Sequence, residues 1–463
     1  MKFISTLFLL CFVGAIQAQV KEVKIPTNLD NITQAYHYNT KQKNFFFLKS
    51  YKKLQGVQMS DSLTVKQSLF TLIPDYPNGT IVAFTVAEEN KATMYIVTDK
   101  NIQSKTFDFE QKTTTTATPF TWDPKEEDSF LHFSHGDKFY ALHSRIRNSQ
   151  IRFLQLDADL KTQKDTMINF TGHNFYLGPH SQVSLNHALQ DSVPMTYIEM
   201  NQPTDLLKAA AQRKYYIHKD VLYITLDTSN QSTEVLSIDL TTQESTYASY
   251  PQPFNKPHLN HPGSNSMLFS NRLVQAYFDK QFITIVLRDQ QGEPIKTYQM
   301  TKDHADFITG EMVAISNVRG LYKDKYAPIE KRSNFLLRAK NASLYGVIAY
   351  PIGDHIVLQF GSGNRTKPFA RNFFFDAFIN GSRTNMFNPY FKSVVSLAST
   401  ALDQQLNPDF SFTIPTEDKL RTLRTKRGFR ITSNKYKLVL KINDQHYYGK
   451  QESRSNTFDL VPF

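Results

Sequence analysis

The sequence predicts an all-β protein, with a β-propeller-like repeat of six to eight blades and little helix as the favoured architecture. Phe and Tyr are abundant, with 36 and 23 residues, whereas Gly is scarce, with 17. Val, Ile and Thr fill short runs between polar clusters, which is typical of strands. A strand–turn–strand unit also recurs along the chain, and this repeat favours the propeller.

The clearest copy of the unit runs from Lys138 to Phe170. Strands predicted at 139–142 and 151–156 are followed by Asp157, and other copies place an aspartate similarly, at Asp61, Asp99, Asp239 and Asp289. Asp at the start of a turn accepts hydrogen bonds from nearby backbone amides. The aspartates are 38, 58, 82 and 50 residues apart, and if the interval of 82 holds two units, the period suits propeller blades. A β-sandwich array is the alternative, because any all-β chain repeats strands and turns.

Helix is expected in few places. Residues 204–215 form the cleanest candidate, with Thr204 as N-cap, and residues 390–402 form a second one. Residues 301–333 carry charges of both signs and few strand runs, so we expect a less regular inserted or linking region there. A strand pattern returns at 335–338.

The two ends of the mature chain are expected to pair. Runs at 435–442 and 446–451 flank Asn443-Asp444-Gln445 and predict a hairpin. In a propeller the last strands often complete the blade begun by the N-terminus. We therefore expect a strand within 20–47 to pair with the last strands, closing a single propeller-like domain that spans 19–463.

Residues 1–18 predict a secretory signal peptide. Lys2 precedes an apolar run of about 14 residues and a small-residue exit, with cleavage expected after Ala18. That run is shorter than the roughly 20 residues of a membrane span, so no transmembrane helix is expected. Cys11 is the single cysteine, so the mature chain has neither a disulfide framework nor a thiolate metal site. The protein is therefore expected in the periplasm, at the cell surface or outside the cell.

The charge balance points to acidic partners. The formal net charge is +11, and Lys and Arg are scattered over most segments. For an exported protein this favours an anionic polysaccharide or another envelope protein as partner over nucleic acid. The densest basic stretch contains Arg421, Arg424, Arg427 and Arg430, three residues apart, whose guanidinium forks predict an anion-binding surface. The competing interpretation is an exposed connector.

The spacing of three histidines suggests a metal site. His173, His180 and His187 recur every seven residues and Asp191 follows, so imidazoles and a carboxylate could converge on a cation. Seven-residue spacing aligns side chains on a helix, however, and Gly178-Pro179 breaks any helix there. Solvated loop histidines are the competing interpretation.

The acidic run Glu126-Glu127-Asp128 lies beside the sole tryptophan, Trp122. A calcium or sugar contact is conceivable from these residue types. Asp123-Pro124 marks a turn, so we interpret the run as a solvated loop and Trp122 as packing. His132 and His135 stand near a strand edge, where turn structure is a sufficient explanation.

No catalytic or cofactor motif is present. Gly-x-Ser-x-Gly is absent, and the glycines at 361 and 363 lack the Lys of a phosphate loop, so we expect no cofactor and leave catalysis undecided. The favoured function is an exported binding or interaction protein. One alternative is a carbohydrate-active hydrolase or lyase with residues dispersed over several blades. Another is an outer-membrane barrel, because the chain ends in Phe463.

Overall fold

A computed structural model describes residues 22–30, 32, 34–39, 43–50, 53–72, 79–178, 181–190, 195–229, 231–253, 263–318, 321–365, 393–414, 438–442, 445–451 and 456–462. The predicted signal peptide lies outside these residues. The chain divides into two compact units. Unit 1 comprises Met1–Asp75, Ser382–Phe387 and Thr432–Phe463, and unit 2 comprises Tyr76–Gly381 and Asn388–Ile431.

Unit 1 contains two four-stranded antiparallel sheets. One has the order β1 (Val23–Pro26), β33 (Thr457–Pro462), β32 (Gln445–Lys450), β31 (Leu438–Ile442). The other has the order β2 (Gln34–Asn39), β3 (Lys43–Lys49), β4 (Lys53–Ser60), β5 (Val65–Leu72). A hydrophobic cluster that includes Ile25, Phe46 and Leu460 joins them.

The expected pairing of the chain ends is present in unit 1. β1 pairs antiparallel with β33, with Val23 opposite Leu460. The predicted C-terminal hairpin is also formed, with Ile442 of β31 opposite Gln445 of β32. The hairpin follows from apolar runs on either side of a short polar sequence, whereas β1 and β33 come from opposite ends of the chain.

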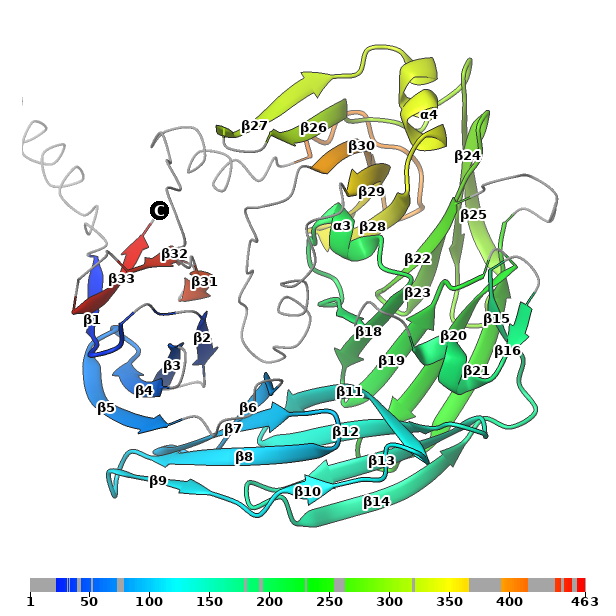
Figure 1. The fold of residues 1–463 in the computed structure, drawn as a ribbon. Coiled ribbons are helices and arrows are strands. Elements are labelled where there is room, and N and C mark those ends of the chain that lie inside the picture. Colours follow the sequence, from blue (N-terminus) through cyan, green and yellow to red (C-terminus); the bar gives the residue numbers. More distant parts are fainter. Residues whose placement is uncertain are drawn as a thin grey trace, which may run out of the picture. The chain divides into compact units, whose positions relative to one another are not determined.

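Unit 2 begins with two sheets and a short hairpin (Figure 1). The first sheet contains β6 (Thr80–Glu88), β7 (Lys91–Val97) and β8 (Asn101–Asp108), and both β9 (Thr113–Thr116) and β10 (Phe120–Thr121) pair with β8. The second contains β11 (Glu127–His135), β12 (Lys138–Arg145), β13 (Gln150–Leu156) and β14 (Thr162–Asn169). The hairpin is β15 (Phe175–Leu177) with β16 (Ser181–Val183).

Three further sheets follow in unit 2. The first contains β17 (Thr196–Tyr197), β18 (Arg213–His218), β19 (Val221–Leu226), β20 (Ser232–Asp239) and β21 (Ser245–Pro251). The second contains β22 (Gly263–Phe269), β23 (Arg272–Phe278), β24 (Phe282–Arg288) and β25 (Pro294–Thr301). The third has the order β27 (Leu321–Pro328), β26 (Met312–Val318), β30 (Ser393–Leu402), β29 (His355–Arg365), β28 (Leu344–Ile352). The helices described are α2 (Leu185–Leu189), α3 (Leu206–Ala209) and α4 (Arg332–Lys340).

Neighbouring sheets of unit 2 share hydrophobic clusters. The rings of Tyr95 on β7 and Phe139 on β12 stack with centroids 4.0 Å apart. Phe133 on β11 lies 6.3 Å from Tyr215 on β18, measured between ring centroids. Because inner strands such as β12 are buried on both faces, their sequences read as continuous apolar runs instead of strict alternation. The all-β prediction is confirmed.

One turn recurs with the same backbone. Through a side-chain oxygen, its first residue accepts a hydrogen bond from the N–H four residues on, and its fourth residue has a positive φ. The copies begin at Ser60, Asp157, Asp289 and Asp403, where this hydrogen bond measures 3.2, 2.9, 2.8 and 2.7 Å, respectively. The residues with positive φ are, in the same order, Leu63, Leu160, Gly292 and Leu406. The predicted turn chemistry of Asp157 and Asp289 is therefore confirmed. That of Asp239 is too, since its Oδ1 accepts two backbone N–H groups at 2.7 Å.

Asp61 and Asp99 lie between paired strands, but neither is the first residue of its turn. The turn after β4 begins at Ser60, one residue before Asp61. Asp99 lies between β7 and β8, whereas the next turn of that sheet begins at Asp108, whose carboxylate accepts a backbone N–H at 2.8 Å. With Ser60 and Asp108 in place, the intervals become 48, 49, 82 and 50 residues. The interval of 82 residues does not hold two repeat units. It is long because a hairpin and two helices precede the strands of one sheet.

The helix predictions also need correction. α3 is one turn long, and its N-cap is Asp205, whose Oδ1 accepts the Leu207 N–H at 2.7 Å, instead of Thr204. It stops early because residues from Arg213 onward pair with β19. The second candidate, at 390–402, overlaps β30, which pairs with strands on both sides. Residues 335–338 lie in α4, and residues 301–333 contain β26 and β27. Within the described ranges, no helix is long and apolar enough to cross a membrane.

Candidate functional site: a polar cavity beside α4

The residues proposed from sequence are only partly described. Arg421, Arg424, Arg427 and Arg430 lie outside the described residues, as do His180 and Asp191 of the metal set. His173 stacks on Tyr247 with ring centroids 4.1 Å apart. His187 lies in α2, and its Nδ1 is 3.1 Å from the hydroxyl of Ser184. Across the described ranges, no group of three or more His, Cys, Asp or Glu side chains is arranged to hold a metal ion.

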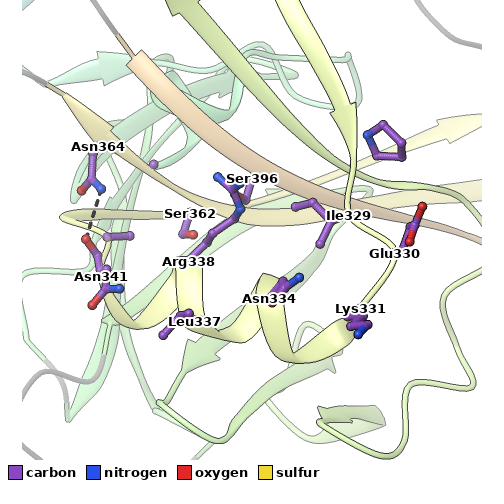
Figure 2. Close-up of a pocket in the computed structure, with 13 residues that line it drawn as sticks. Ile329, Glu330, Lys331, Asn334, Leu337, Arg338, Asn341, Ser362, Asn364 and Ser396 are labelled. Atoms are coloured by element: carbon purple, nitrogen blue, oxygen red, sulfur yellow. Dashed lines mark hydrogen bonds between the residues drawn. The ribbon is translucent and has the colours of Figure 1, made fainter.

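The cavity that the sequence did not reveal lies in unit 2, between α4 and the strands β29 and β30 (Figure 2). Its volume is about 610 Å³, which is in the range of small-molecule sites. Polar side chains dominate the lining, which consists of Pro328, Ile329, Glu330, Lys331, Asn334, Leu337, Arg338, Asn341, Ala342, Ser362, Gly363, Asn364 and Ser396.

One wall of the cavity is a polar face of α4. Phe335 and Leu336 are buried in the hydrophobic core and hold the helix against the sheet. Lys331, Asn334 and Arg338 are spaced three and four residues apart, so they follow one another along a single face. This face borders the cavity because the apolar side of the helix is committed to the core.

The facing wall is made of small residues on paired strands. Ser362 of β29 is opposite Ser396 of β30, and the two residues are 2% and 3% exposed. A Cβ atom on the neighbouring Gly361 would lie 1.9 Å from the carbonyl oxygen of Ser396, so glycine permits the close approach of the strands there. The small side chains leave the space that α4 overhangs.

The C-terminal end of α4 is tied to β29. Asn364 Nδ2 donates to the carbonyl of Asn341 at 3.1 Å, and Asn364 Oδ1 accepts the Ser343 N–H at 2.8 Å. Figure 2 shows these two asparagines at one end of the cavity and Glu330 with Lys331 at the other. The helix is thus held at its end by an amide that also borders the cavity.

The cavity has a positive balance. Lys331 and Arg338 are exposed, and neither forms an ion pair with any other residue that the structure describes. Glu330 is the carboxylate of the lining, and the remaining polar groups are amides and hydroxyls. Free cations beside hydrogen-bonding amides and hydroxyls provide a binding surface for anionic or polyhydroxylated molecules.

A second polar cluster overturns the solvated-loop interpretation of Glu127. Glu127 is 4% exposed, begins β11, and has its carboxylate 3.3 Å from His143 Nδ1 and 3.2 Å from the Arg152 guanidinium. Burial alone would raise the pKa of Glu127, but His143 and Arg152 together lower it. The edge of Trp122 packs on His143, with ring centroids 4.7 Å apart, so the packing interpretation of Trp122 stands.

The two histidines of β11, His132 and His135, have different environments. His132 is buried and bonded to Ser129, and burial lowers the pKa of His132 to about 3. His135 Nε2 lies 2.7 Å from the carboxylate of Asp220, in the turn between β18 and β19. His135 therefore links two sheets, which its sequence position did not indicate.

A third cluster is wholly buried. Lys214 Nζ lies 2.6 Å from Asp227 Oδ2, 2.7 Å from the carbonyl of Ala211 and 3.2 Å from Asn265 Oδ1. Asp227 also accepts hydrogen bonds from the hydroxyls of Thr233, at 2.7 Å, and Ser266, at 2.9 Å. These contacts join the β17–β21 and β22–β25 sheets. They also give both Lys214 and Asp227 several hydrogen-bond partners within the protein.

Comparison with known proteins gives no family. No family model and no curated protein matches the chain. Among solved structures, an apocarotenoid oxygenase mutant from Synechocystis is similar at 11% identity over 59% of this chain and 62% of its own, with a TM-score of 0.29. The chain thus spans about three-fifths of that enzyme.

Two further solved structures show similar likeness. An uncharacterized protein from Listeria monocytogenes EGD-e has 9% identity over 72% of this chain and 78% of its own, with a TM-score of 0.32. Prolyl oligopeptidase B from Galerina marginata has 9% identity over 72% of this chain and 46% of its own, with a TM-score of 0.31. Likeness at this level supports neither a family nor an activity for the chain.

Proposed function

We propose that this protein is an exported binding protein with a propeller-like scaffold, and that its ligand occupies the cavity beside α4. The working location is the periplasm, the cell surface or the surroundings of the cell. An anionic polysaccharide is the favoured class of partner, because the chain is basic and the cavity contains two cations that form no ion pair with the residues described.

The scaffold proposal is supported by the number and the order of the sheets. Seven sheets of four or five strands are described, which lies within the six to eight expected for the blades. Each of the three shared hydrophobic clusters of unit 2 joins sheets that are neighbours in sequence. Packing between sequence neighbours is a property of propeller blades.

The cavity lining carries the functional proposal. A hydrolase or lyase would need an acid and a base that face one pocket, typically two carboxylates or a carboxylate with a histidine. Here the polar lining consists of one carboxylate with Lys, Arg, Asn and Ser side chains. These groups can orient a polar ligand by hydrogen bonds and charge, which favours binding over the hydrolase alternative.

The test is to block the cavity and measure binding. Asn334 is exposed on the cavity face of α4, so N334W should fill the space without entering the core. Lys340→Trp places the same side chain on the same helix, away from the lining, and is the matched control. Isothermal titration with a panel of neutral and acidic trisaccharides should find a ligand that wild type and K340W bind and N334W does not.

Two outcomes contradict the proposal. Binding that survives N334W moves the ligand away from the cavity, and absence of binding across the panel removes the saccharide-binding function. Export is checked independently, by expressing the full chain in a bacterial host. Mass spectrometry of the exported protein should then give an N-terminus at Gln19.

A further inference from the structure

The two cations of the cavity are well separated. Lys331, the N-cap of α4, and Arg338 within the helix are seven residues apart, and at 1.5 Å per residue this places their backbones about 10 Å apart along the helix axis. Figure 2 shows Arg338 extending toward Ser362 and Ser396, while Lys331 lies at the opposite end of the helix face. This placement keeps the two cations at separate ends of the helix face, so each can bind an anionic group of its own.

The position at Arg338 suits a carboxylate or a sulfate. A guanidinium presents parallel N–H donors that match two oxygens of such a group. The hydroxyls of Ser362 and Ser396 border the same part of the cavity and can donate to further oxygens. The strand pairing of these serines makes this end rigid.

The position at Lys331 has a different chemistry. The ammonium group is a point charge, and it stands at the N-cap of α4, where no side chain caps the helix. The first backbone N–H groups of the helix and its dipole therefore add to the attraction of an anion at this end. Asn334 lies between the two positions and can bond to neutral hydroxyls with its amide.

We infer that the cavity holds an acidic oligosaccharide through two of its acid groups, one at Arg338 and one near Lys331. This inference rests on the proposed function and specifies its ligand. Neutral sugars are commonly held by stacking on aromatic rings, whereas the side chains that line this cavity are polar or aliphatic. Charge and hydrogen bonds must therefore supply the affinity. An acidic chain can use both, whereas a neutral chain can use the hydrogen bonds alone.

The experiment uses probes matched in size and differing in charge. Isothermal titration compares galacturonate, trigalacturonate, maltotriose and inorganic phosphate on the full mature chain at low salt. Trigalacturonate should bind at least tenfold tighter than galacturonate or phosphate, because it alone reaches both positions. Maltotriose should bind at least tenfold more weakly than trigalacturonate.

Single-charge variants locate the contacts. R338Q and K331Q should each weaken trigalacturonate binding about tenfold or more and bring it near the affinity of galacturonate. K340Q removes the same charge from the same helix outside the lining, so its affinity should stay within twofold of wild type. A thermal melt of each variant separates loss of contact from loss of fold.

Each contrary result has its own meaning. If maltotriose binds as tightly as trigalacturonate and N334W abolishes both, the binding function holds and the acidic ligand is wrong. If phosphate binds as tightly as the trimer, the two-position model is wrong. If R338Q and K331Q behave like K340Q, neither cation contacts the ligand. If no saccharide binds, both the inference and the proposed function fall.

Discussion

Two polar clusters of unit 2 use similar residue types with opposite results. In the closed cluster of Lys214 and Asp227, both side chains are 0% exposed and the ammonium has three acceptors within 3.2 Å. In the open cluster beside α4, Lys331 and Arg338 face a cavity and have no ion-pair partner among the described residues. The comparison teaches that hydrogen-bond satisfaction, more than residue type, separates a structural cluster from one available to a ligand.

The largest effect is expected from breaking the closed cluster. K214M leaves the Asp227 carboxylate buried without its counter-charge, and the free energy of unfolding should fall by about 3–5 kcal/mol. Urea unfolding measures this change, and K208M, at a half-buried lysine of α3, is the control, with a change below about 0.5 kcal/mol. The double variant K214M/D227L should recover part of the loss. A loss in K214M as small as that of K208M would show that the cluster is not structural.

A pH titration tests a neighbour of the closed cluster. Glu234 lies in β20, its Oε2 has no hydrogen-bond partner among the described residues, and burial raises the pKa of Glu234 from 4.5 to about 7. The folded state therefore binds this proton more tightly than the unfolded state, and stability falls as pH rises from about 4.5 through 7. The loss should be on the order of 3 kcal/mol.

E234Q isolates this contribution. The stability difference between wild type and E234Q should change over the same pH range, because the amide does not titrate. Urea unfolding at pH 5, 6, 7 and 8 measures it. A difference that is constant across these pH values would mean that Glu234 ionises normally in the folded protein.

A smaller effect is expected where a polar group is satisfied but exposed. Asp157 Oδ1 accepts two backbone N–H groups, from Asp159 and Lys161, each at 2.9 Å, in the turn after β13. D157A should cost about 1 kcal/mol, because water replaces the lost acceptor. D159A, at the exposed neighbouring position, is the control. If D157A lowers the free energy of unfolding as much as K214M does, hydrogen bonding without burial would be enough to explain the stability of the closed cluster.

The smallest effect on stability is expected in the open cluster. R338Q and K331Q should change the free energy of unfolding by less than about 0.5 kcal/mol in the absence of ligand, because neither cation has an ion-pair partner to lose in the part of the chain that the structure describes. Thermal melting of the free protein measures this, and a fall of several degrees in the midpoint would place these side chains with the structural cluster.

Local chemistry made the strands and many turns predictable. The apolar runs at 139–142 and 151–156 lie in β12 and β13. The aspartates at 157, 239 and 289 start turns, because a carboxylate accepts hydrogen bonds from backbone amides two to four residues on, whatever the rest of the chain does. At position 60 the same role passed to a serine, and the assignment from sequence slipped by one residue because both types accept such bonds.

The expectation for residues 390–402 shows where local signals lose. Val394, Val395, Leu397 and Ala398 permit a helix by spacing alone, but this segment gains backbone hydrogen bonds with β26 on one side and β29 on the other. The same applies to α3, which ends where the pairing of β18 begins. Sheet pairing decided both segments, and for residues 390–402 the partner strands lie far along the chain, where a short sequence window contains no information about them.

The sequence by itself determined the all-β class and the chemistry of the repeated turns, because both depend on residues that are close along the chain. The tertiary structure decided the candidate site. Lys331, Asn334 and Arg338 read as an ordinary charged stretch until Ser362 and Ser396, up to 65 residues further on, face them across a cavity. The tertiary structure also buries Lys214 beside Asp227 and leaves Arg338 facing the cavity. Whether a cation has partners depends on which side chains the fold brings within hydrogen-bond distance.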